Sequence, residues 1–149
     1  MKHINEVIKG YGPADKMAKD NNSCTVKSLS AAFEISFDDA HTFARKEWNR
    51  VNGRGVRTLT MLNTFPITDD IDRIVLEKRM KRVVATQDYI QADGSKVIRQ
   101  MTLSTFCKKY PSGKHYILVS GHALVIDNGE VVDYTDKMSR RIKWAWRVS

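Results

Sequence analysis

Three residues of this 149-residue chain have the types and the order of a nucleophilic triad: Cys24, His122 and Asp133. The last two flank Asn128-Gly129, a dipeptide that favours a two-residue turn between β-strands. A hairpin closed by this turn makes the histidine and the aspartate diagonal neighbours on one face of a sheet, where their side chains can meet. A histidine oriented by a carboxylate can activate a nucleophile, and the thiol of Cys24 is the candidate nucleophile.

The segment that contains the histidine and the aspartate predicts three consecutive strands, at residues 115–119, 122–126 and 130–134. In this register Leu124 faces Asp133, and this pairing places Asp133 one position diagonally from His122. Asp136 lies three residues further on and would point to the opposite face, because side chains alternate along a strand. It is therefore the weaker candidate for the acid that orients the histidine.

Cys24 is predicted to lie in the first turn of a helix that runs to Phe33, because residues 21–23 offer N-cap oxygens and apolar residues follow at helical spacing. The helix dipole and the unpaired N–H groups at this position stabilise a thiolate, which is the reactive form of cysteine. Cys107 lies inside a predicted helix over residues 102–110 and is interpreted as a small core residue.

The elements that must position these residues are helices first and an antiparallel sheet last, which predicts an α+β fold. Residues 74–76 suggest a helix, whereas residues 1–20 are expected to form an arm that lies over a single domain of residues 21–149. The other predicted elements are helices at 36–52 and 58–65, a hairpin around Asp93-Gly94 at 88–100 and a closing strand at 142–148.

Composition narrows the class of protein. No apolar run approaches the roughly 18 residues of a membrane span, and no signal-peptide core is evident, so a cytoplasmic location is expected. Two cysteines are too few for a disulfide scaffold, which favours free thiols in a reducing compartment. The acidic run at residues 69–72 lacks the glycine and the final glutamate of a calcium loop. We predict no metal and no cofactor.

The net charge of +8 indicates either a solvated basic surface or an anionic partner. Basic residues cluster at residues 78–82 and 137–143. Neither cluster carries the interleaved aromatic residues of a platform that stacks single-stranded nucleic acid. Both interpretations stay open on the sequence alone.

Two segments carry a resemblance to a known family. The first is a helix that opens with Cys24 after Asn-Asn-Ser, and the second is Gly-Lys-His-Tyr-Ile-Leu-Val-Ser-Gly-His-Ala-Leu-Val-Ile-Asp-Asn-Gly-Glu-Val-Val-Asp-Tyr at residues 113–134. Together they resemble the small papain-like cysteine peptidase proteins of phages and bacteria, which are related to the double-glycine leader peptidases. The resemblance covers residues 21–65 and 101–146.

The resemblance implies a papain-like fold in which Cys24 is the nucleophile, His122 the general base and Asp133 the orienting acid. Such peptidases usually carry a glutamine for the oxyanion hole several residues before the cysteine, but here the sixth residue upstream is Ala18. Asn21 or Asn22, together with the backbone N–H of Cys24, are the candidate oxyanion donors instead.

The function expected from these observations is a thiol hydrolase that acts on a peptide or isopeptide bond of a protein substrate, in a host cytoplasm if the chain is phage-encoded. Three alternatives remain open at this point. They are an inactive papain-like fold that serves as a basic binding module for a host protein, a nucleic-acid binder driven by charge, and a cell-wall amidase of the same fold.

Overall fold

The computed structural model describes residues 2–8, 23–51, 53–133 and 138–149, and it has an α+β architecture. The helical elements are η1 (Ile4–Glu6), α2 (Cys24–Phe33), α3 (Phe37–Trp48), α4 (Thr58–Met61) and α5 (Leu103–Lys109). The strands are β1 (Lys2–His3), β2 (Arg73–Val75), β3 (Lys78–Val83), β4 (Thr86–Ile90), β5 (Lys96–Gln100), β6 (Lys114–Val119), β7 (His122–Asp127), β8 (Glu130–Asp133) and β9 (Ile142–Val148).

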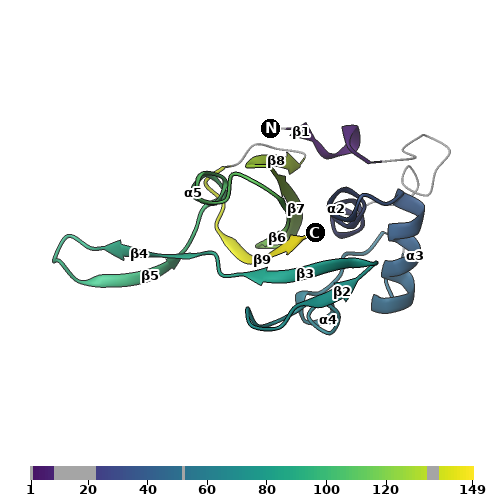
Figure 1. Ribbon diagram of the computed structural model, residues 1–149, viewed down its shortest axis with the longest axis horizontal. Helices are drawn as coiled ribbons and strands as arrows, with labels where there is room; N and C mark the ends of the chain where they lie inside the picture. The colour runs from purple at the N-terminus through teal and green to yellow at the C-terminus, as the bar shows by residue number, and fades with distance from the viewer. Residues whose placement is uncertain (1, 9–22, 52, 134–137) are drawn as a thin grey trace.

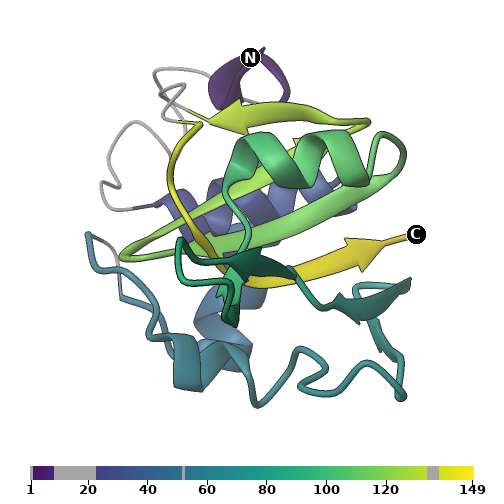
Figure 2. The same ribbon diagram turned by 90° about the vertical axis from the view of Figure 1, so that its left-hand side faces the viewer.

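Seven strands form one sheet in the order β1-β8-β7-β6-β9-β3-β2. All neighbours in this sheet are antiparallel except β1 and β8, which run parallel. Helices α2 and α3 cover one face and α5 covers the other, while β4 and β5 project from the body as a separate hairpin (Figures 1 and 2). The prediction of helices first and a mostly antiparallel sheet last is confirmed.

Alternation along the central strands explains this layering, because successive side chains enter opposite faces of the sheet. Tyr116 and Leu118 of β6 belong to the core under α2, whereas Ile117 and Val119 belong to the core under α5. Helix α2 is buried along almost its whole length, from Thr25 to Phe33, as expected for a helix between a sheet and other helices.

The C-terminal meander forms as predicted. Asn128 and Gly129 have φ angles of 50° and 76°, which match the two positive values that a type I′ hairpin turn requires. Asp127 pairs with Glu130 in the observed register, so the sheet places Leu124 opposite Asp133 as the sequence predicted. The helices α2 and α5 and the strand β9 also lie where they were expected.

The prediction of a helix around residues 74–76 is wrong, because these residues lie in the β2–β3 hairpin. Leu76 and Glu77 take positive φ angles of 49° and 65°, which turn the chain. Val75 is buried and Ile74 is 67% exposed, so the side chains alternate as in a strand. The local apolar run resembled a helix, but Ile74 and Val75 pair with Arg79 and Lys78 of β3.

Three other boundaries differ from the predictions. Helix α3 ends four residues before the predicted residue 52, since Asn49 takes a left-handed φ of 50°, and α4 ends at Met61 rather than at residue 65. Residues 2–8, which belong to the predicted arm, are packed: β1 pairs with β8, and Ile4 is 1% exposed. The rest of that segment, residues 9–20, lies outside the described residues.

Among the described residues, no helix is long and apolar enough to cross a membrane.

The close packing at Gly129 gives a prediction about stability. A Cβ at this position would lie 3.1 Å from the Cys107 carbonyl oxygen, and the φ of 76° is itself unfavourable for alanine. Gly129→Ala should lower the free energy of unfolding by about 2 kcal/mol or more in urea denaturation.

Gly121→Ala is the matched control, because Gly121 has a φ of 68° but no atom within 4 Å of an added Cβ. Its free energy of unfolding should fall by only about 1 kcal/mol, which is the cost of the left-handed backbone for alanine. Equal losses in the two variants would contradict the packing described at Gly129.

Candidate active site

Cys24 is the first residue of α2, and the helix holds it against the sheet. Its N-cap residue is Ser23, whose carbonyl accepts the Lys27 N–H at 2.8 Å, although the Ser23 side chain makes no capping bond. The buried Tyr116 hydroxyl of β6 donates to the Thr25 carbonyl at 3.0 Å. This bond joins the first turn of the helix to the centre of the sheet, and so fixes where the thiol lies.

His122 is the first residue of β7, directly after the turn that ends β6. Gly121 permits this turn with its positive φ, because it has no Cβ to clash. The next residue, Ala123, packs in the core under α2, and its backbone is a hydrogen-bond partner of the Cys24 sulfur. The turn therefore places the imidazole beside the N-terminus of α2.

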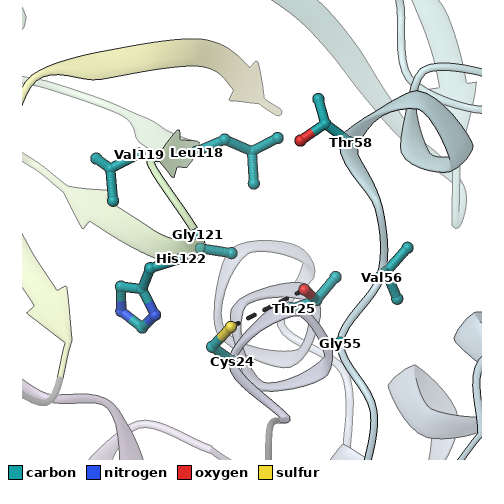
Figure 3. Close-up of a pocket in the computed structure, with 10 residues that line it drawn as sticks. Cys24, Thr25, Gly55, Val56, Thr58, Leu118, Val119, Gly121 and His122 are labelled. Atoms are coloured by element: carbon teal, nitrogen blue, oxygen red, sulfur yellow. Dashed lines mark hydrogen bonds between the residues drawn. The ribbon is translucent and has the colours of Figure 1, made fainter.

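Asp133 ends β8 and is 2% exposed. Its Oδ1 lies 2.7 Å from Nε2 of His122, so the diagonal contact predicted from the hairpin is present. With Nε2 engaged by the carboxylate, Nδ1 is the ring nitrogen left for the thiol. Figure 3 shows the imidazole and the Cys24 sulfur pointing toward one another across the mouth of a pocket.

The histidine is held in its charged form. The hydrogen bond that the ring donates to Asp133, and then the contact with Cys24, raise the pKa of His122 to about 9, against the opposing effect of burial. Burial raises the pKa of the Cys24 thiol, but hydrogen bonds from His122 and from the Ala123 backbone outweigh it. The net pKa of Cys24 lies below the ordinary value of 9.0, so the site favours the thiolate more than an ordinary cysteine environment does.

The pocket beside the pair has a volume of about 130 Å³. This is close to the size of an engineered cavity that accepts benzene, so it has room for about one small side chain. One wall comes from Gly55 and Val56, just before α4, and from Thr58, the first residue of α4. The other wall comes from the end of β6 (Figure 3).

Sequence reasoning missed several of these residues. Gly55, Val56 and Thr58 carry no chemical signature, and only the fold brings them to the cysteine. Tyr116 was also not predicted as part of the site. Burial and the nearby Cys24 raise its pKa well above 10.0, so its hydroxyl stays protonated and donates a hydrogen bond. Gly121 could have been found from its position in the turn between the predicted strands at 115–119 and 122–126.

Asn21 and Asn22, the candidate oxyanion donors, lie outside the described residues, as does Asp136. Among the described residues, the groups near the thiol include the Thr25 hydroxyl, 4.0 Å from the sulfur, and the Ala123 backbone. The first N–H groups of an α-helix have no acceptor within the helix, so those at the start of α2 are the candidate oxyanion donors.

Cys107 is separated from this site. It lies on α5, which packs on the face of the sheet opposite α2 (Figure 2). Burial raises the pKa of its thiol, so the neutral form is favoured. Within the described ranges, no group of three or more His, Cys, Asp or Glu side chains is placed to hold a metal ion.

Comparison with protein-family models, with curated proteins and with solved structures finds no match for this chain.

The two thiols should differ in reactivity. Brief treatment of the folded protein with substoichiometric iodoacetamide should place the adduct on Cys24, because its pKa is lowered while that of Cys107 is raised. Mass spectrometry of tryptic peptides identifies the site. Labelling of Cys24 should persist well below pH 9.0, and His122→Ala should move it to higher pH, since burial alone raises the thiol pKa. Adducts that appear first on Cys107 would remove Cys24 from the site.

Proposed function

We propose that the protein is a thiol hydrolase that cleaves a peptide or isopeptide bond with Cys24 as nucleophile, His122 as acid and base, and Asp133 as the orienting carboxylate. One observation carries the proposal: a single imidazole contacts both a thiol at a helix N-terminus and a buried carboxylate, at the mouth of a pocket. These are the three roles of a nucleophile, a base and an orienter. The resemblance to papain-like cysteine peptidases supports the same assignment.

In the proposed reaction, the Cys24 thiolate attacks the carbonyl carbon and the C=O electrons move to oxygen. Backbone N–H groups of the first turn of α2 stabilise this oxyanion. The His122 imidazolium then gives its proton to the leaving amine as the C–N bond breaks, which leaves a thioester on Cys24. Neutral His122 takes a proton from water, the hydroxide attacks the thioester, and the acid product leaves with Cys24 again a thiolate.

Asp133 positions the histidine in this scheme. Its carboxylate binds Nε2, so Nδ1 carries the proton that is transferred at the thiol side. Its charge also favours the imidazolium, which must persist until the amine leaves. In this scheme Asp133 therefore orients the imidazole and stabilises its charge, and it transfers no proton.

The test uses an activated ester, p-nitrophenyl acetate, because it acylates a reactive thiol without any knowledge of the natural substrate. Wild-type protein should release nitrophenolate and carry an acetyl group on Cys24 by intact mass, and Cys24→Ala should do neither. Asp133→Asn should fold normally and lose at least about 100-fold in acylation rate at pH 7, because its amide does not stabilise the imidazolium.

Asp127→Asn is the matched control, since Asp127 ends the same hairpin strand that His122 begins, far from the thiol. It should acylate at the wild-type rate. Asp136→Asn should also be close to wild type, and a larger loss there than in Asp133→Asn would overturn the assignment of the orienting acid. A folded wild-type protein that forms no acetyl adduct would refute the hydrolase proposal itself.

A further inference from the structure

A second concave site lies on the face of the sheet that α5 covers, away from Cys24. This basic pocket has a volume of about 560 Å³ and is formed by β3, β6, β9 and α5. Its lining includes Lys81, Lys109, Tyr110, His115 and Arg147. Lys81 belongs to the basic cluster at residues 78–82, so part of that cluster lines this pocket. The proposed hydrolase mechanism gives these basic residues no role.

The strand register places three nitrogen-bearing side chains in one row across the sheet. Lys81 of β3 lies directly opposite Arg147 of β9, and Arg147 lies directly opposite His115 of β6. Like charges directly opposite each other on antiparallel strands destabilise the pair. A bound anion would remove this repulsion.

The described residues form no ion pair with these cations, Lys81, Lys109 and Arg147, although Asp69 also lines the pocket. Their charge is felt inside the pocket: burial, and then the Arg147 guanidinium, lower the pKa of His115 to about 4. His115 is therefore neutral at pH 7, and its buried Nδ1 has no hydrogen-bond partner among the described residues.

Gly113 leaves room for the guanidinium of Arg147 beside the start of β6. The guanidinium lies 3.1 Å from the position that a Cβ on Gly113 would occupy. A planar guanidinium can bind two oxygens of one phosphoryl group at once.

We propose that the basic pocket binds a phosphoryl group carried by a small ligand of nucleotide size. The row of Lys81 and Arg147 with Lys109 supplies the charge for the phosphoryl oxygens. The volume lies in the range of small-molecule sites, and Tyr110 with Val83 offers an apolar wall for the rest of the ligand. The site lies on the face opposite Cys24, so it does not depend on the proposed hydrolase activity.

Isothermal titration of the full chain with ADP, and separately with adenosine, tests the proposal. ADP should bind and adenosine should not, since adenosine lacks the phosphoryl groups. Arg147→Ala and Lys81→Ala should each weaken ADP binding about tenfold or more, the loss expected for one charge-assisted hydrogen bond. Lys143→Ala is the matched control, because Lys143 is another exposed cation of β9 that does not line the pocket. It should change the affinity less than twofold.

Three results would overturn the proposal. They are no binding of ADP, equal binding of adenosine, and equal losses in Lys143→Ala and Arg147→Ala, which would indicate a diffuse charge effect. A further titration uses a single-stranded oligothymidylate of fifteen nucleotides. If it binds in an Arg147-dependent way while ADP does not, the source of the phosphoryl groups is a nucleic acid and the small-ligand assignment is wrong.

Discussion

The packing of α2 against the centre of the sheet is the constraint on which the rest of the structure depends. The helix packs against β6 and β7, and Ala31 and Ala32 are buried in the core that they share. The Tyr116 hydroxyl then fixes the first turn through the Thr25 carbonyl. Since the start of β7 lies beside that turn, the position of one helix determines the distance between the thiol and the imidazole.

The same packing buries the Asp133 carboxylate, which therefore needs a partner for its charge. A carboxylate as buried as that of Asp133 loses most of its hydration, which costs several kcal/mol unless a partner compensates. His122 provides that partner at 2.7 Å, and its pKa rises as a result. Removing either member leaves the other uncompensated, so the pair is held together by the cost of separating it.

The candidate active site and the basic pocket have different chemistry. At the candidate active site, a buried carboxylate lies 2.7 Å from the imidazole that contacts the thiol, and the pKa of that thiol is lowered. In the basic pocket, Lys81 and Arg147 lie side by side and make no ion pair with a described residue, although Asp69 also lines the pocket. Strand alternation explains the second arrangement, because it places His115 and Arg147 on the face toward α5, together with Ile117 and Ala145.

Much of the candidate site was predictable because its determinants are local. The Asn128-Gly129 dipeptide sets the register, and the register alone places Asp133 diagonal to His122. The helix that begins at Cys24 was likewise encoded by its own apolar spacing. No local pattern, however, indicates that the helix and the hairpin are in contact. That contact was predicted from the order of Cys24, His122 and Asp133 in the chain and from the family resemblance.

The failures of prediction have two causes. Residues 74–76 suggested a helix because the apolar run is short, whereas Ile74 and Val75 pair with β3 across a turn that the positive φ angles of Leu76 and Glu77 close. The other failures come from contacts between segments far apart in the sequence. The packing of residues 2–8 depends on the parallel pairing of β1 with β8, which lies more than 120 residues further along the sequence. No local pattern encodes this pairing. The walls of the pocket at Gly55 and Val56 are equally the product of distant contacts.

The central claim is that Asp133 and Cys24 hold His122 as an imidazolium, and NMR measures this most directly. The ¹H–¹³C correlation of the imidazole should be followed from pH 5 to pH 11 in the wild type and in Asp133→Asn. His122 should titrate near 9 in the wild type and clearly lower in Asp133→Asn. A wild-type value close to 6.5, the ordinary pKa of histidine, would contradict this claim.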